Sequence, residues 1–397
     1  MRNIIFISDL HIGDGSSKDD FSHDMLFSSF INEWNDLENP ELVIVGDGFE
    51  ILESEMVRHA GLRPFWEIVH SLDGELIKLI EHVHPKVFEA LSKFKGKIKY
   101  VIGNHDYYIL KNKNLQENLK ERIENLEIVP YYYDEQTHIL AVHGNQFDAI
   151  NRFLEVDGEI IPPLGDFISR YMMINFDDVL KEYLPDEVVS DYDNVRPILD
   201  VFQWLEQISK IYNTGVDLLK LWIDNFITMM REEEAKYWMK KSYPFLSKLS
   251  ILFLNKIGGI KLGELLVRAV MKTRNLKKTD YLKKAAIKIF INPEWFFNNM
   301  NGYVDKADTT GIQDFNDIQG IVMGHNHKPG FELIKIKNDV KFYVNCGSWK
   351  PVVERKSGNI FQRYYEVFYA IARVDNSGEI EIITGSVNNL RKKEVIG

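Results

Sequence analysis

Five short segments of this 397-residue chain carry side chains that bind metal ions, and each follows a run of apolar residues. The segments are Asp9-Leu10-His11, Gly46-Asp47, Gly103-Asn104-His105-Asp106, His143-Gly144 and Gly324-His325-Asn326-His327. They offer carboxylates, imidazoles and one amide, a mixture of ligands that suits divalent cations. The set is large enough for two ions side by side, and a paired centre of this kind predicts metal-dependent hydrolysis.

The elements that must position these side chains are strands that alternate with helices in residues 1–150. Short β-branched runs predict strands at residues 3–8, 42–45, 99–102 and 139–142. Periodic apolar residues predict helices at 20–35 and 76–94, and Pro85 is expected to break the second one. Because an α/β sheet gathers its ligands at the carboxyl ends of its strands, the five segments are expected to meet there.

The pattern changes between residues 151 and 315, where apolar periodicity predicts helices. These helices are expected at residues 195–212, 216–239, 246–271 and 279–290. Strand signals then return at 320–323, 331–337, 340–345, 363–374 and 379–384. We therefore expect one discontinuous α/β core, residues 1–150 and 316–397, with a large and mostly helical insertion or cap, residues 151–315.

Charge is unevenly distributed along the chain, whose net charge is −11 at pH 7. Fourteen lysines and arginines lie between residues 236 and 290, against only Glu264 and Asp280. A positive region of this kind attracts phosphates, nucleic acid or a phospholipid surface, although lysines that only solvate helices would look the same. The sequence predicts no particular oligomeric state.

The location that the sequence favours is the cytoplasm. A single cysteine, Cys346, excludes an internal disulfide and fits a reducing compartment. No signal peptide is recognisable, and no run reaches the roughly 18–20 apolar residues that span a bilayer. Peripheral contact with a membrane through the basic insertion is a further expectation.

In their order, the five motifs resemble the calcineurin-like metallophosphoesterase superfamily over about residues 1–150 and 316–350. The resemblance implies a two-sheet sandwich flanked by helices, with two ions that share Asp47. The implied ligands of the first ion are Asp9, His11, Asp47 and His327. The implied ligands of the second ion are Asp47, Asn104, His143 and His325.

The same resemblance implies a mechanism. Two divalent ions, expected to be Mn²⁺ with Fe or Zn as alternatives, would share a hydroxide that attacks phosphorus in line. His105 would protonate the leaving oxygen. Asp106 would orient the His105 ring and raise its basicity.

Residues that flank the motifs narrow the resemblance to one branch of the superfamily. Residues 46–52, 143–148 and 343–349 are similar to the branch of UDP-2,3-diacylglucosamine pyrophosphatases, which cut a pyrophosphate bond in a nucleotide-linked lipid. The insertion is far longer than the cap of that branch, and His105 stands where those enzymes carry arginine. We expect hydrolysis of a phosphodiester or pyrophosphate bond in a small, nucleotide-linked or lipid-linked anionic substrate. A nuclease that uses the basic insertion, and a phosphomonoesterase or protein phosphatase, are the alternatives.

Overall fold

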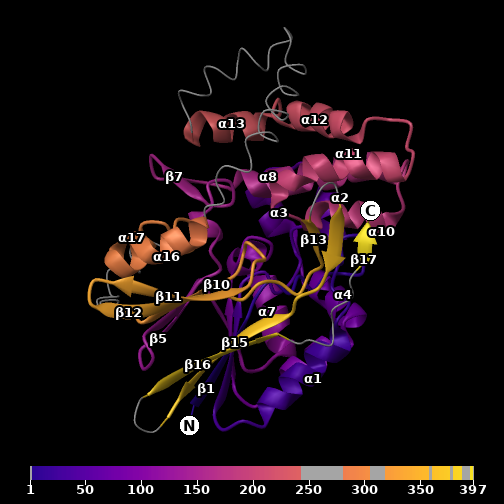
Figure 1. The fold of residues 1–397 in the computed structure, drawn as a ribbon. Helices are drawn as coiled ribbons and strands as arrows, with labels where there is room; N and C mark the ends of the chain where they lie inside the picture. Colours follow the sequence, from indigo (N-terminus) through magenta and orange to yellow (C-terminus); the bar gives the residue numbers. More distant parts are fainter. Residues whose placement is uncertain are drawn as a thin grey trace.

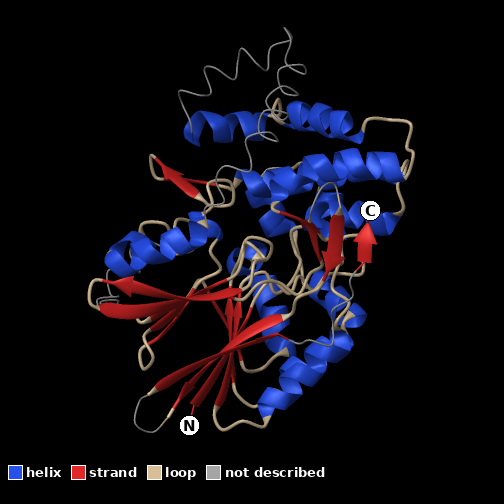
Figure 2. Cartoon of the chain, in the orientation of Figure 1, coloured by secondary structure: helices blue, strands red, loops and turns tan. Residues whose placement is uncertain are grey.

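The computed structural model describes residues 2–242, 280–304, 318–356, 360–375, 379–386 and 394–396. At its centre two sheets pack face to face (Figures 1 and 2). The first sheet contains, in spatial order, β16 (Ile380–Ser386), β15 (Phe368–Val374), β1 (Arg2–Ile7), β2 (Pro40–Val45), β3 (Lys97–Val101) and β4 (Leu126–Val129). The second contains β11 (Gly330–Ile336), β12 (Asp339–Asn345), β10 (Gly320–Met323), β6 (Ile139–Ala141) and β5 (Tyr132–Asp134).

The strands that precede the five motifs run parallel within each sheet. In the first sheet β1 to β4 are parallel neighbours, and β15 joins β1 from the other side in antiparallel register. In the second sheet β10 lies parallel to both β6 and β12. Phe6, Val45 and Val322 belong to the apolar layer between the sheets, which explains why these strands read as continuous apolar runs. The predicted α/β class is confirmed.

Helices cover the outer face of the first sheet. They are α1 (Asp24–Asn35), α4 (Glu75–Val83), α5 (Pro85–Ser92) and α7 (Lys113–Arg122). Phe27, Leu76 and Val87 pack there in one core with Ile5 and Leu42 of the strands. The predicted break at Pro85 is confirmed, because α4 ends at Val83 and the proline begins α5. The shorter helices of this half are α2 (Glu55–Ala60), α3 (Phe65–Ser71), α6 (Tyr107–Lys111) and the 3-10 turn η1 (Asn145–Phe147).

Described residues between 154 and 242 are mostly helical and lie beyond the ends of the strands (Figure 1). The helices are α8 (Leu164–Asn175), α9 (Asp177–Lys181), α10 (Asp186–Asp191), α11 (Val201–Ile211), α12 (Leu218–Met229) and α13 (Glu233–Ser242). Short elements between them are β7 (Leu154–Val156), β8 (Glu159–Ile161), η2 (Tyr192–Asn194), β9 (Val195–Arg196) and η3 (Ile198–Asp200). None of the described helices is both long and apolar enough to cross a membrane.

This helical segment shares its core with strands from the carboxyl-terminal part of the chain. Trp204 and Trp238 pack in one cluster with Val353 and Phe361. Those two residues lie on β13 (Val352–Arg355) and β14 (Phe361–Tyr364), which form a small sheet in the order β17-β14-β13-β9 with β17 (Glu394–Ile396). The helical segment therefore folds together with residues that the sequence assigned to the α/β core.

The last described part of the predicted insertion packs differently. Leu282 and Phe296, on α16 (Tyr281–Ile291) and α17 (Glu294–Phe297), belong to the same core cluster as strand residues, and α16 contacts β11 and β12 of the second sheet. Asp280 caps α16, because its Oδ1 accepts hydrogen bonds from the backbone N–H groups of Leu282 and Lys283. The boundaries of the predicted insertion stay a prediction. The expected helix at 246–271 and most of the basic region 236–290 lie outside the described residues.

Buried ion pairs fasten the helical segment to the sheets. Lys18 lies 2.7 Å from Asp177 and also pairs with Asp193, whereas Lys350 lies 3.1 Å from Asp20 on the core side. Asn194 donates a hydrogen bond of 3.0 Å to Asp20. Breaking one partner of such buried pairs is costly, so this network fixes the segment in one position.

A buried histidine holds the loop from which Lys18 and Asp20 project. His84 is only 3% exposed, and its ring nitrogens lie 2.8 Å from Asp19 Oδ2 and 3.0 Å from Asp24 Oδ1. Burial lowers the pKa of His84, but the two carboxylates outweigh it and raise that pKa to about 9.

Replacing His84 by alanine is expected to lower the free energy of unfolding by about 3 kcal/mol at pH 6, because Asp19 loses its buried partner. A folded-state pKa above the ordinary value stabilises the fold fully below about pH 6.5, and this contribution is lost as pH rises through about 9. Urea denaturation of the metal-free protein between pH 6 and 10 measures both effects. The exposed His82→Ala variant is the control, and a deficit for His84→Ala that stayed constant with pH would contradict the charged pair.

Candidate metal centre

The first predicted ligand of each motif lies two or three residues beyond the carboxyl end of a parallel strand. Asp9 follows β1, Asp47 follows β2, Asn104 follows β3, His143 follows β6 and His325 follows β10. Since the carboxyl ends of these strands lie at the same edge of the packed sheets, the fold brings together side chains that are far apart in sequence.

Five of the seven predicted ligands have left-handed backbone conformations. The φ angles of Asp9, His11, Asp47, His325 and His327 are 53°, 51°, 50°, 67° and 57°. Such angles are uncommon for residues with a Cβ atom and cost on the order of 1–3 kcal/mol each. Strain gathered at one place indicates that the surrounding structure holds these side chains for a function rather than for stability.

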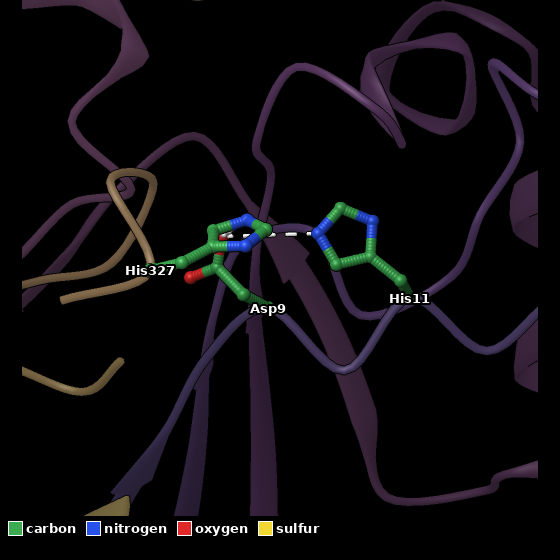
Figure 3. A group of neighbouring side chains, drawn as sticks. All are labelled: Asp9, His11 and His327. Atoms are coloured by element: carbon green, nitrogen blue, oxygen red, sulfur yellow. Dashed lines mark ion pairs between the residues drawn. The ribbon is translucent and has the colours of Figure 1, made fainter. Parts of the chain in front are cut away.

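The first group of ligands is Asp9, His11 and His327, whose side chains converge on one point (Figure 3). His327 Nε2 lies 3.2 Å from Asp9 Oδ1, and His11 Nε2 lies 3.9 Å from the same oxygen. His11 Nε2 is also 3.9 Å from Asp47 Oδ2, so Asp47 borders this group.

The second group is Asp47, His143 and His325, whose ligand atoms lie within 4.8 Å of one another. His143 Nε2 is 3.0 Å from Asp47 Oδ2. Asn104 lines the same cavity as Asp47 and His325. Asp47 therefore borders both groups, which is the place that a bridging carboxylate requires.

Three buried atoms of these side chains suit a divalent cation. His11 Nε2 and Asn104 Oδ1 have no hydrogen-bond partner among the residues that the structure describes, and His143 Nε2, 3.0 Å from Asp47 Oδ2, makes no hydrogen bond there either. Leaving such groups unsatisfied is costly, and a divalent ion would satisfy all three. The other ring nitrogens are occupied: His11 Nδ1 donates to Glu50 Oε2 over 2.7 Å and His143 Nδ1 to the Val45 carbonyl over 2.9 Å. Both rings are thereby turned with Nε2 toward the centre.

The charges of the centre also suit a cation. Burial alone would raise the pKa values of Asp9 and Asp47, but His143 and the other imidazoles outweigh it. The pKa of Asp9 is held well below its usual range, and that of Asp47 is also lowered. Both side chains are therefore carboxylates at neutral pH, as metal ligands must be.

Two motif glycines make room for this packing. Gly46 has a φ of 81°, and a Cβ atom on it would lie 2.4 Å from the His143 ring. A Cβ atom on Gly103 would lie 2.1 Å from Asp47 Oδ1. Side chains at these positions would displace two predicted ligands, which explains why glycine accompanies the ligands in these motifs.

The predicted role of Asp106 is wrong. Glu50, not Asp106, contacts the His105 ring: His105 Nδ1 lies 2.8 Å from Glu50 Oε1. Burial lowers the pKa of His105, but Glu50 and Asp47 outweigh it and raise that pKa to about 10. Glu50 also holds His11, so one carboxylate orients both a predicted ligand and the predicted proton donor. Its signal in the sequence was its place three residues after Asp47 in the same motif.

Asp106 instead joins two motif loops. It accepts hydrogen bonds from the backbone N–H groups of Gly48 and Gly103 and from the Tyr100 hydroxyl, at 2.9, 2.6 and 2.7 Å. Burial and the nearby Asp47 raise the pKa of Asp106 to about 7. Although Asp106 is adjacent to His105 in sequence, its side chain points away from that ring and toward the backbone of the two loops.

A cavity of about 420 Å³ opens over the predicted ligands. Residues that the sequence did not single out for the site also line it, among them Arg196, Tyr281 and Lys350. Arg196 comes from the helical segment and lies 3.3 Å from His327 Nδ1. A larger depression of about 1380 Å³, at the amino ends of β1 and β3, contains none of the predicted ligands, so the smaller cavity is the candidate site.

The comparison with protein families agrees with this geometry. The family model of calcineurin-like phosphoesterases matches residues 2–243, more than half of the chain. The match includes five of the seven predicted ligands, and the last two, His325 and His327, follow β10 beyond it. No curated protein matches the chain. The chain belongs to the calcineurin-like phosphoesterase family and is a metal-dependent phosphoric ester hydrolase.

Proposed function

We propose that the enzyme hydrolyses a phosphodiester or pyrophosphate bond, in which each phosphorus carries a single negative charge and two substituents. The observation that carries this proposal is the charge of the cavity. Besides the predicted ligands it is lined by three cationic side chains, Arg196, Lys350 and His105, and by three carboxyl groups, Glu53, Asp148 and Asp193, so these side chains add no net positive charge. A phosphomonoester brings about 1.5 to 2 negative charges at neutral pH, which this balance disfavours.

All three cationic side chains are already engaged. Lys350 pairs with Asp20, Arg196 donates to the backbone carbonyls of Asp193 and Val195, and His105 bonds to Glu50. The cavity therefore has no spare positive charge for the second negative charge of a monoester. A diester, which carries an uncharged second substituent in its place, is the better substrate here. The wall of the cavity supports the same preference, because Ile150 and Ile198 line it and remain 43% and 57% exposed. Apolar side chains at an opening favour a substrate with an apolar part, which a lipid-linked phosphodiester or pyrophosphate would supply.

The residues around the centre have separate proposed roles as metal ligands and as proton donor. Two divalent ions, for which we propose Mn²⁺, would neutralise charge on the phosphoryl oxygens and lower the pKa of water. Asp9, His11, Asp47 and His327 would hold one, and Asp47, Asn104, His143 and His325 the other. His105, oriented by Glu50, would give a proton to the leaving oxygen.

The nuclease alternative has less support. Of the basic region, only residues 236–242 and 280–290 are described. Lys283 there pairs with Glu332, and Lys288 lies over the ring of Trp295 at 5.0 Å. These lysines are engaged within the chain, so they offer little to a phosphate backbone. Cytoplasmic location and peripheral membrane contact stay proposals.

The first test compares a diester with a monoester. Protein stripped with a chelator and reloaded with Mn²⁺ is expected to hydrolyse bis(4-nitrophenyl) phosphate with a kcat/KM about tenfold above that for 4-nitrophenyl phosphate. The stripped protein is expected to be inactive. A faster reaction with the monoester would instead establish the phosphomonoesterase.

A second test removes the shared ligand. Asp47→Asn is expected to lower kcat/KM for the diester by about a thousandfold, because the amide neither bridges two ions nor balances their charge. Elemental analysis is expected to find two ions per wild-type chain and fewer in the variant. The exposed Asp73→Asn variant is the control. Full metal content with full activity in Asp47→Asn would remove Asp47 from the centre.

A third test concerns the proton donor. His105→Asn is expected to slow a diester with an alkyl leaving group by about 10²–10⁴-fold. A diester that releases 4-nitrophenolate is expected to be slowed far less, because this anion leaves without a proton. Asp106→Asn is expected to leave the ratio of the two rates as in the wild type, since Asp106 does not face the ring. Equal losses on both substrates for His105→Asn would contradict its role.

A further inference from the structure

Glu53 is a buried carboxylate in the wall of the cavity that the reaction described above does not use. It follows β2 and precedes α2, and it is only 6% exposed. A ligand atom of Glu53 lies within 4.8 Å of atoms of Glu50 and His105. Its Oε2 has no hydrogen-bond partner within the part of the chain that the structure describes. A buried, unpartnered carboxylate is expensive, so its presence here needs an explanation.

The cations around Glu53 are committed elsewhere. Lys18, Lys350, His105 and Arg196 favour its ionised form, whereas Asp193, Glu50 and Asp177 oppose it. Lys18 pairs with Asp177 and Asp193, and Lys350 pairs with Asp20. Among the described residues, Glu53 forms no ion pair with either lysine. His105 bonds to Glu50 and Arg196 to backbone carbonyls, so none of these cations bonds to Glu53 Oε2 among the described residues.

We propose that Glu53 binds a cationic amine carried by a substituent of the substrate's phosphorus. This inference rests on the proposed hydrolysis of a phosphodiester or pyrophosphate and narrows its substrate to a zwitterion, with an anionic phosphoryl group and an ammonium group a few bonds apart. An ammonium group donates up to three hydrogen bonds and brings the charge that Glu53 lacks.

The arrangement of the cavity separates the two charges of such a substrate. Arg196 lies beside His327, on the side of the predicted ligands, where the phosphoryl oxygens would be. Glu53 lies beside His105, where the leaving oxygen would take its proton. A neutral hydroxyl would give Glu53 a hydrogen bond but leave its charge unbalanced, so the amine is the better partner.

Three substrates that differ in one substituent test this. They are methyl diesters of phosphate whose leaving substituent is 2-aminoethyl, 2-hydroxyethyl or ethyl, so that the varied group lies on the side of His105. Release of methyl phosphate by the metal-loaded full chain, measured by chromatography, gives kcat/KM for each. The wild type is expected to prefer the aminoethyl over the ethyl ester by about tenfold or more, the magnitude of one charge-assisted hydrogen bond. Glu53→Gln is expected to reduce this ratio to about twofold, mainly through KM.

Two further variants serve as controls for the Glu53→Gln result. Glu55→Gln removes a carboxylate two residues away whose side chain is 42% exposed, and it is expected to keep the wild-type ratio. Glu53→Asp keeps the negative charge on a side chain that is one methylene shorter, and it is expected to give an intermediate ratio. This variant keeps the test decisive if Glu53→Gln does not fold.

The outcomes separate the inference from the proposed function. Equal rates on all three diesters, or an unchanged ratio in both Glu53 variants, would overturn the inference and leave diester hydrolysis standing. A hydroxyethyl ester preferred as strongly as the aminoethyl ester would overturn the requirement for a cation. Failure to hydrolyse any diester would overturn the proposed function, and the inference with it.

Discussion

Asp47 has to face two groups of ligands at once, and much of the local structure follows from this constraint. Its backbone is left-handed, its Oδ1 accepts a hydrogen bond of 2.8 Å from the His105 backbone N–H, and its Oδ2 lies 3.0 Å from His143 Nε2. A Cβ atom on Gly46 would collide with the His143 ring and one on Gly103 with the Asp47 carboxylate, so this arrangement requires glycine at both positions. The large apolar core of the two packed sheets offsets this backbone strain, since strained sites persist only where the surrounding structure is stable enough to hold them.

The helical segment covers part of this centre. Its residues Arg196 and Ile198 line the cavity over the predicted ligands. The buried pair of Lys18 with Asp177 and the hydrogen bond from Asn194 to Asp20 fix the segment against the loop that His84 holds. The position of these cavity residues therefore depends on charges that are buried between the segment and the core.

Local patterns in the sequence predicted the strands well, because an apolar run and the polar residue after it need no knowledge of distant contacts. Range 320–323 agrees with β10, whereas 363–374 was expected as one strand and forms two, β14 and β15. Contacts between distant segments were not predictable in this way: Glu50 was missed, and Asp106 was given its role. Adjacency to His105 in sequence says nothing about the direction of a side chain in a tight loop.

Three carboxyl groups near His105 show how partners, rather than residue type, decide a role. Glu50 is bonded to two imidazoles, which outweigh its burial and hold its pKa well below the usual range. Asp106 is bonded to two backbone N–H groups and a tyrosine, and burial raises its pKa to about 7. Burial also raises the pKa of Glu53, whose Oε2 has no hydrogen-bond partner among the described residues. Glu50 therefore orients imidazole rings and Asp106 joins two loops. Of the three, Glu53 is the one whose carboxyl oxygen is available to a ligand.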